Sequence, residues 1–400
     1  MDTGRDEDSH LRRAVAERVA DLEELLLAVS HDIHAHPEVG GEEHHACELL
    51  VATLRDRGFE VEHPVAGLDT AFVARRQLAG RGPRVAFLAE YDALPKLGHA
   101  CGHNWIAATS LGAALALAEA AASCAGEVLL IGTPGEENLG GKVIMAAQGV
   151  FDHVDAALMT HPSRHTQVDR TSLANCPIEV VFRGRSAHAA ADPQAGVNAL
   201  DAAVLLLVAV DQLKRSLRDD ARVPGVITHG GEVANVVPER AEARFSLRAA
   251  DKTYVDFMRQ RLEECARGAA IATRCEVSTR LYEPQYLELV SNPVLVTLFR
   301  EELARLGLEE TAAQARGMGS LDIGNVSHLV PAIHPDLAIA EGHVGSHTPA
   351  FCDAAISPRA DAMIAVAAEA LAATGLRLLE DPDLVADAKA HLPRDVATLA

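Results

Sequence analysis

Hydrophobic positions follow two different repeats in the first part of the chain. Apolar residues three and four apart, such as Leu11, Val15, Val19 and Leu22, predict amphipathic helices. Short apolar runs bounded by Gly, Pro or charged residues predict buried strands. In chain order the predicted elements are helix 10–31, helix 42–57, strand 84–89, helix 104–123, strand 127–132, helix 140–149 and strand 155–160. This alternation predicts an α/β fold with a mostly parallel sheet and helices on both of its faces.

The pattern changes near Ser172, where apolar and polar residues begin to alternate. Residues 176–183 and 242–248 alternate in this way, which is typical of antiparallel strands with one buried face. Helical patterns over 196–216 and 251–268 accompany them. After this segment the chain again predicts helices and buried strands like those of residues 10–160, namely helix 292–306, strand 336–340 and helix 357–374. We therefore predict a catalytic domain formed by 1–171 and 287–400, with a smaller α+β domain inserted at 172–286.

Composition narrows the class of protein. The chain has 400 residues, enough for two cores, and a formal net charge of −21, which argues against nucleic acid or an anionic membrane as a partner. Its seven cysteines have no framework spacing, so a reducing compartment is expected. The charged N-terminus does not resemble a signal peptide, and the Ala-rich run 106–122 is interpreted as a core helix. A cytoplasmic location is the resulting expectation.

Two short clusters after predicted strands carry candidate chemistry. Cys101 and His103 flank Gly102, which allows both side chains to face one point. Glu136 and Glu137 follow Gly-Thr-Pro-Gly. Adjacent side chains of an extended segment point in different directions, so one carboxylate can bind a metal while the other accepts a proton from water. A cysteine nucleophile with a histidine base is the alternative for the first cluster, and a solvated helix start is the alternative for the second.

Further histidines lie in similar positions. His161 ends the run 156–160, and His347 lies in a loop flanked by Gly and Pro. Each alone could be structural, but four separate segments that place Cys, His or Glu at strand ends favour a metal site at one edge of the sheet. The histidines near the N-terminus are interpreted as structural because their spacing does not place them on one helical face. These are His31, His34, His36, His44 and His45.

A series of motifs in this order resembles the peptidase M20 family of metallopeptidases and amidohydrolases. The motifs are Asp92-Ala-Leu-Pro95, His99-Ala-Cys-Gly-His103, Gly132-Thr-Pro-Gly-Glu-Glu137, Thr160-His-Pro162, Gly184-Arg-Ser-Ala-His188 and Ser346-His-Thr-Pro349. The similarity is greatest to the amidohydrolase branch, which includes aminobenzoyl-glutamate hydrolases, auxin-conjugate hydrolases and dipeptidases. It extends from about residue 31 to 352. Other M20 enzymes carry a His where this chain has Glu90, and His103 is expected to supply that imidazole.

The resemblance implies specific roles. Two divalent metal ions, zinc or manganese with cobalt as a further option, would be bound by Cys101, His103, Glu137, His161 and His347. Glu136 would be the general base, and Asp92 would orient a ligand imidazole. The inserted domain would be a lid that also forms a homodimer. In it His188 would polarise the scissile carbonyl, and Asn235 and Arg248 would hold the substrate carboxylate.

We therefore expect metal-dependent hydrolysis of an amide or peptide bond in a small carboxylate-bearing substrate, a dipeptide or an N-acyl amino acid, by a metal-activated water. Cleavage of N-carbamoyl or N-acetyl amino acids at the same site is one alternative. A non-catalytic metal-binding protein and a cysteine hydrolase that uses Cys101 are the others. The sequence assigns no role to Ser320, Asp322, His99, His328 and His343.

Overall fold

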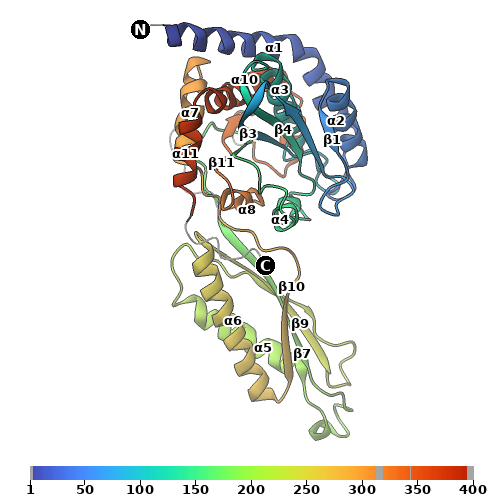
Figure 1. The fold of residues 1–400 in the computed structure, drawn as a ribbon. Coiled ribbons are helices and arrows are strands. Elements are labelled where there is room, and N and C mark those ends of the chain that lie inside the picture. Colours follow the sequence, from blue (N-terminus) through green and yellow to red (C-terminus); the bar gives the residue numbers. More distant parts are fainter. Residues whose placement is uncertain (1–2, 312–318, 343, 394–400) are drawn as a thin grey trace. The chain divides into compact units, whose positions relative to one another are not determined.

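The computed structural model describes residues 3–311, 319–342 and 344–393 (Figure 1). The described chain forms two compact units. Unit 2 consists of Ser172–Glu288 with residues 319–321, and unit 1 contains the rest.

Unit 1 is built around a six-stranded mixed sheet. The strands β4, β3, β5 and β11 run parallel to one another, whereas β2 is antiparallel to β4 and β1 is antiparallel to β2. The spatial order is β1 (Glu60–Glu62), β2 (Phe72–Gln77), β4 (Ala125–Gly132), β3 (Gly80–Ala89), β5 (Ala156–Leu158) and β11 (Ala332–Ile333). Because β3, β4 and β5 are parallel, their carboxyl ends meet at one edge of the sheet.

Three long helices form the main core with this sheet. The helices α3 (His103–Ala120) and α10 (Pro358–Glu380) pack on β3 and β4, and α1 (Thr3–Ala35) packs on both helices. In α3 every residue except the last two is buried, so the helix is apolar all round. A Cβ at Gly112 would come within 2.5 Å of Leu26, and glycine therefore permits the close contact of α3 with α1. Although α10 is long and apolar enough to cross a membrane, 67% of its apolar window is buried inside this protein.

Shorter elements complete unit 1. A two-stranded parallel pair, β6 with β12, continues from β5 and β11. The bounds are α2 (His44–Asp56), α4 (Gly141–Ala147), β6 (His161–Ser163), α7 (Pro293–Arg305), α8 (Ile323–Ser327), β12 (Asp336–Ala338), α9 (Pro349–Ala354) and α11 (Pro382–Ala390).

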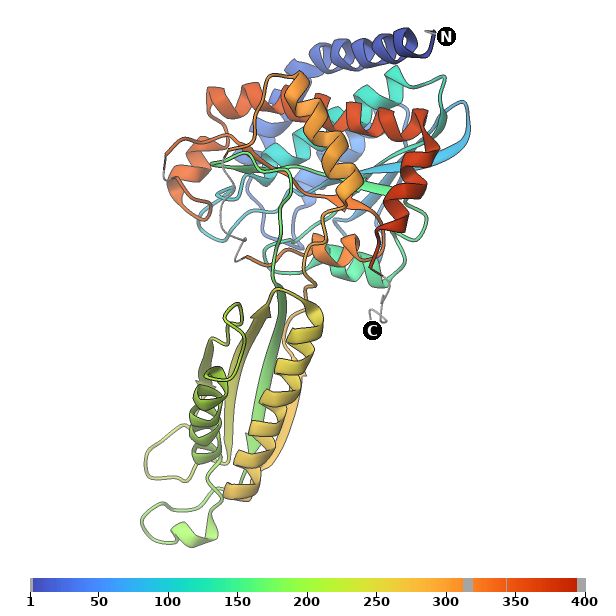
Figure 2. The ribbon, with the colours of Figure 1, turned by 90° about the vertical axis from the view of Figure 1, so that its left-hand side faces the viewer.

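Unit 2 is a four-stranded antiparallel sheet with two helices on one face (Figure 2). Apolar residues of β7 and β9 pack against the helices in a separate core that includes Ile178, Phe182 and Phe245. The elements are β7 (Ala174–Arg183), a 3₁₀ turn η1 (Pro193–Ala195), α5 (Ala199–Lys214), β8 (Gly225–His229), β9 (Arg240–Ala249), α6 (Lys252–Thr273) and β10 (Glu276–Leu281), in the spatial order β10-β7-β9-β8.

The predicted helices and strands are present, with some differences. The alternation in β9 is confirmed by its burial pattern, but nearly all of β7 is buried because Arg244 and Arg280 cover Glu179 on its second face. The strand predicted at 336–340 ends at Ala338, and the helix predicted at 357–374 continues to Glu380. The antiparallel strands β1, β2, β8 and β10 were not predicted, since they are short or largely polar.

Candidate metal centre

Polar residues follow three neighbouring strands at the same edge of the sheet in unit 1. Glu90 and Asp92 come after β3, and Glu136 and Glu137 come after β4. His161 begins β6, three residues after β5 ends. Because Ala89 pairs with Gly132 and Phe87 pairs with Leu158, the backbone register brings these side chains together.

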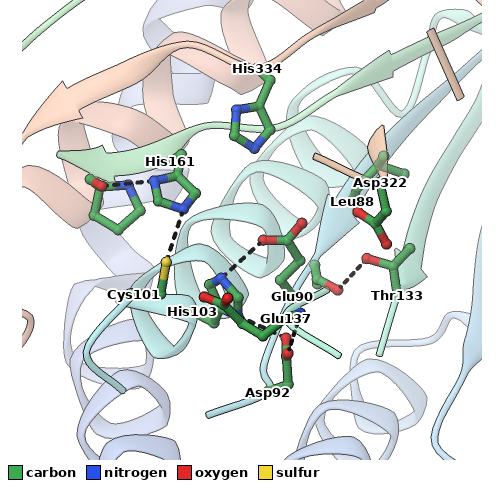
Figure 3. A network of polar contacts seen from close by, with 12 residues as sticks. Leu88, Glu90, Asp92, Cys101, His103, Thr133, Glu137, His161, Asp322 and His334 are labelled. Atoms are coloured by element: carbon green, nitrogen blue, oxygen red, sulfur yellow. Dashed lines mark hydrogen bonds and ion pairs between the residues drawn. The ribbon is translucent and has the colours of Figure 1, made fainter. Parts of the chain in front are cut away.

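Cys101 lies at the centre of the cluster. Its Sγ is 3.7 Å from Nε2 of His161 and 3.6 Å from Nε2 of His347. Gly102 has φ of 77°, and a Cβ there would lie 2.6 Å from Pro162, so only glycine allows the sharp bend into α3. The bend turns Cys101 and His103 toward His161 (Figure 3). Chain segments as far apart as residues 101 and 347 therefore converge on one sulfur atom.

Two imidazoles are oriented by the hydrogen bonds of their Nδ1 atoms. The Nδ1 of His103 lies 2.7 Å from a carboxylate oxygen of Asp92, and the Nδ1 of His161 lies 2.8 Å from the carbonyl oxygen of Pro162. Both oxygens are acceptors, so each Nδ1 carries a proton and each Nε2 is the ring nitrogen that faces the cluster. Nε2 is therefore the atom of each ring that can bind a metal.

The loop that carries Glu136 and Glu137 is held through its backbone. Asp92 accepts the N–H of Glu137 at 3.0 Å through its second oxygen, and Glu43 accepts the N–H of Gly135 at 2.7 Å. Glu43 also accepts hydrogen bonds from Gly41 N–H and the Thr70 hydroxyl. Buried carboxylates thus fix both ends of the peptide segment, Gly135 to Glu137, that contains the candidate base.

The two adjacent glutamates differ in their electrostatic environment. Burial, reinforced by Asp322 and Glu90, raises the pKa of Glu136 well above its usual value. Burial also acts on Glu137, but the hydrogen bond from His347 and the charge of His103 outweigh it and lower the pKa of Glu137. Neighbouring carboxyl groups with pKa values pushed apart are typical of a proton acceptor beside an anionic ligand.

The donor atoms fit two divalent cations. Cys101, His103 and His161 have ligand atoms within 4.8 Å of one another, and so do Cys101, Glu137 and His347. Two buried atoms without a hydrogen-bond partner face this region, namely Nε2 of His103 and one oxygen of Glu90. This region also holds several carboxyl groups and a thiol but only one nearby lysine, Lys142. Buried negative charge that is not balanced destabilises the fold, and bound cations would balance it. The carboxyl groups belong to Glu90, Asp92, Glu136, Glu137 and Asp322.

Cys101 is poorly suited to act as a nucleophile. Burial raises the pKa of its thiol, and the nearby carboxylates raise it further, although His103 acts in the opposite direction. A reactive cysteine requires a lowered pKa, and the environment here does the reverse. Metal coordination removes the proton directly, which suits a thiol buried among imidazoles and carboxylates.

A buried ion-pair group, which the sequence analysis did not predict, adjoins the cluster. The Nζ atom of Lys142, on α4, lies 2.5 Å from Glu90 and 2.8 Å from Asp322, and all three side chains are fully buried. The other oxygen of Glu90 lies 3.5 Å from Nε2 of His103. The only sequence signal was a lysine directly after Gly140-Gly141, five residues after Glu137.

The three residues predicted to bind substrate, His188, Asn235 and Arg248, lie in unit 2 near opposite ends of β9. His188 and Asn235 are on adjoining loops, joined by the hydrogen bond from Ala189 N–H to the Asn235 carbonyl. Arg248 pairs with Asn175, near the point where the chain enters unit 2. His188 is exposed, and its Nδ1 accepts N–H groups of Ala190 and Ala191, so its Nε2 carries the proton. Unit 2 of one chain therefore does not bring His188 and Asn235 together with Arg248.

Several of the remaining histidines have local partners. His31 contacts Asp361, His34 contacts the Cys352 carbonyl, and His36 and His45 lie beside Asp32. Asp32, His36 and His45 form an additional surface group of possible ligand atoms. The sequence analysis interpreted both histidines as structural and did not predict this group. Burial lowers the pKa of His99 to about 3, so that ring is neutral. His343 lies outside the described residues.

Comparison with known proteins agrees with this architecture. Residues 172–274 match the model of the peptidase dimerisation domain of M20 proteins. The chain is 38% identical to the mouse (Mus musculus) Xaa-Arg dipeptidase over 94% of its own length and 90% of that protein. It is 34% identical to one of the subunits of the p-aminobenzoyl-glutamate hydrolase of Escherichia coli, over 70% of this chain and 62% of that protein. A dinuclear metal-binding M20 peptidase from Bacillus subtilis has the same fold, with a TM-score of 0.68, 22% identity, and coverage of 90% and 99% of the two chains.

A parallel-sheet unit with a thiolate–imidazole–carboxylate cluster, and an inserted antiparallel unit, define a metal-dependent hydrolase of amide or peptide bonds. The 38% identity to a dipeptidase over 94% of this chain then identifies the family. The chain belongs to the M20 peptidase family.

Proposed function

We propose that this protein hydrolyses the peptide bond of dipeptides that carry a free carboxylate. The observation that carries the proposal is the convergence of Cys101, His161 and His347, whose Sγ and Nε2 atoms lie 3.6 to 3.7 Å apart. One cation would be bound by Cys101, His103 and His161, and a second by Cys101, Glu137 and His347. When bound, two such cations polarise the scissile carbonyl and lower the pKa of water. Zinc and manganese suit this mixture of donors, and cobalt is a usable substitute.

Glu136 is the proposed general base. Its carboxylate lies within 4.8 Å of the ligand atoms of His103 and Glu137, but it belongs to neither group that contains Cys101. Its raised pKa makes it a better proton acceptor than Glu137. It takes a proton from the attacking water and delivers that proton to the leaving amine. Asp92 keeps His103 in the tautomer with a free Nε2 and holds the backbone of Glu137, so it acts as a positioning residue.

His188, Asn235 and Arg248 are proposed to bind the substrate in a dimer. The protonated, exposed Nε2 of His188 is suited to donate to the carbonyl oxygen. Arg248 and Asn235 are suited to the substrate carboxylate. Because Arg248 lies at the other end of β9, we propose that His188 and Asn235 serve the site of a partner subunit while Arg248 serves its own.

The exposed apolar side chains of unit 2 support such a dimer. Val204, Leu205 and Val208 form one exposed face of α5, and Val226 is exposed on the edge strand β8. Unpaired edges and apolar helix faces are typical of surfaces covered by a second chain.

The preferred substrate class follows from two observations. The two Xaa-Arg dipeptidases are 38% and 34% identical to nearly the whole chain, and the formal net charge of −21 attracts a cationic substrate. N-acyl amino acids are the second candidate, because the aminobenzoyl-glutamate hydrolase chain is 34% identical over 70% of this protein. The N-carbamoyl and N-acetyl amino acids belong to this second class. The same charge supports a cytoplasmic protein that acts on small molecules rather than on nucleic acid or membranes.

The experiment is a substrate panel on metal-loaded protein. Dipeptides ending in Arg, Lys and Leu would be compared with p-aminobenzoyl-glutamate and with N-acetyl and N-carbamoyl amino acids, with zinc, manganese or cobalt. We expect the highest kcat/KM for Xaa-Arg, loss of turnover with a chelator, and recovery on metal addition. Turnover that survives the chelator but not a thiol alkylator would indicate a cysteine hydrolase instead. Full metal occupancy without turnover of any substrate would indicate a metal-binding protein.

A further inference from the structure

His334 lies at the metal cluster without belonging to it. It follows β11, and its backbone lies between Ile333, which pairs with Leu158, and Asp336, which pairs with His161. Within this pairing the N–H of His161 donates to the carbonyl of Pro335 at 2.8 Å. The His334 side chain is 1% exposed, and its ring centroid is 5.3 Å from that of His161.

The proton of the His334 ring is placed by Arg170. A guanidinium can only donate, and Nη1 of Arg170 lies 3.1 Å from Nδ1 of His334, so Nδ1 is the acceptor. The same nitrogen of Arg170 bonds Asp336 at 2.6 Å, which holds the guanidinium in place and neutralises its charge. The ring is therefore the neutral tautomer with its N–H at Nε2.

That N–H faces the reaction site. Figure 3 shows the ring of His334 beside His161, with one ring nitrogen directed toward the side of the cluster where Glu90 lies. Besides the hydrogen bond from Arg170, the ring contacts its own backbone, and His334 is in none of the groups whose ligand atoms lie within 4.8 Å of one another. A donor of a buried ring that is directed at a catalytic cluster is suited to an oxygen atom of a bound substrate.

We propose that Nε2–H of His334 donates a hydrogen bond to the oxygen of the scissile carbonyl as that oxygen becomes an oxyanion. The inference rests on the proposed amide hydrolysis and adds an oxyanion donor from unit 1 itself. A neutral imidazole is suited to this role because it stabilises the developing charge without giving up its proton. Arg170 and Asp336 act as positioning residues that keep the donor on the correct nitrogen.

A matched pair of variants separates the two ring nitrogens. In His334→Gln the side-chain amide reaches the place of Nε2 and can still donate there. In His334→Asn the amide reaches only the place of Nδ1, so it can accept from Arg170 but cannot reach the substrate. We expect kcat of His334→Asn to fall about 10²- to 10³-fold with little change in KM, whereas His334→Gln stays within about tenfold of the parent. Both should retain the parent metal content by elemental analysis.

Binding of a phosphinic dipeptide analogue, whose tetrahedral phosphinate mimics the oxyanion, gives a second measurement by calorimetry. It should weaken in His334→Asn by a factor similar to the loss in kcat and change little in His334→Gln. His165→Asn is the control, since His165 contacts the same Asp336 at 3.4 Å from a half-buried loop position, and it should behave like the parent.

Three results would overturn the inference. They are parent-like kcat in His334→Asn, equal losses in both variants, and loss of metal in both variants. If the parent protein hydrolyses none of the substrates but the analogue still binds more weakly to His334→Asn than to His334→Gln, the proposed function fails while the donor role stands. If the parent protein does not bind the analogue, the donor role fails.

Discussion

Asp92 and His103 form a buried pair in which a carboxylate oxygen lies 2.7 Å from the ring Nδ1. The second oxygen of the same carboxylate accepts the N–H of Glu137 at 3.0 Å. One side chain after β3 therefore orients an imidazole at the start of α3 and the loop after β4. Burial alone would raise the pKa of Asp92, but His103 lowers it, so the carboxylate is ionised and able to accept both hydrogen bonds.

Asp92→Asn should weaken metal binding about 10- to 100-fold. The amide can donate to Nδ1 of His103, which would place the ring proton on Nε2, where a metal needs a lone pair. Competition with a chromogenic chelator measures the affinity. Asp21→Asn, on the exposed surface of α1, is the control and should bind metal like the parent. Unchanged affinity in Asp92→Asn would mean that His103 is not a ligand.

Glu136→Gln and Glu137→Gln should separate turnover from metal content. The first variant loses a base and is expected to lose at least about 10²-fold in kcat with parent-like metal content, because general base catalysis contributes about that much. The second variant loses a ligand and is expected to lose bound metal. Elemental analysis beside kinetics makes the comparison. Metal loss in Glu136→Gln with full metal in Glu137→Gln would reverse the two roles.

Lys142→Met should destabilise the protein by about 3–5 kcal/mol, because Glu90 and Asp322 would be left as buried charges without a cation. Urea unfolding of the metal-free protein measures the loss. Lys389→Met is the matched control, since its ion pair with Asp155 is exposed and worth at most about 1 kcal/mol. Adding Glu90→Gln to Lys142→Met should recover part of the stability. Equal effects of the two lysine substitutions would contradict the importance of the buried group.

Inactive His188→Ala and Glu136→Ala proteins should restore activity when they are mixed. If His188 serves the partner subunit, a mixed dimer contains one complete site, and an equal mixture reaches about a quarter of the parent activity after random exchange. Turnover after co-refolding of the two variants provides the measurement. A mixture of Glu136→Ala with Glu137→Ala should stay inactive and serves as the control. No recovery in the first mixture would place His188 in its own subunit's site.

Glu43 should make stability fall as the pH rises. Burial raises the pKa of its carboxyl to about 7 in the folded protein, whereas the unfolded value is 4.5. Between these values the folded state binds a proton that the unfolded state has lost, so the free energy of unfolding decreases by about 2–3 kcal/mol from pH 5 to pH 8. Urea unfolding of chelator-treated Glu43→Gln should show a pH dependence weaker by this amount. Glu42→Gln, at an exposed neighbour, should keep the parent slope, and an unchanged slope in Glu43→Gln would disprove the shift.

Much of the site could be predicted because its residues mark strand ends. Cys101, Glu136 and His161 each follow a recognisable buried strand, and parallel strands align their carboxyl ends by register. Lys142 and His334 could not be found in this way. A lysine near a helix start normally points to solvent, and a histidine before a proline has no characteristic partner. Only the folded chain shows that Lys142 is fully buried between two acids and that Arg170 fixes the ring of His334.

The sequence by itself determined the order of elements, the inserted antiparallel unit and the set of residues able to bind metal, because periodicity and residue chemistry are local properties of the chain. Tertiary structure decided which of those residues meet. It brought His347 to Cys101 across 246 positions, directed Nε2 of two imidazoles at the same sulfur, and separated Arg248 from His188 by the length of β9. Such relationships depend on strand register, helix packing and hydrogen-bond direction between distant segments, which no local pattern encodes.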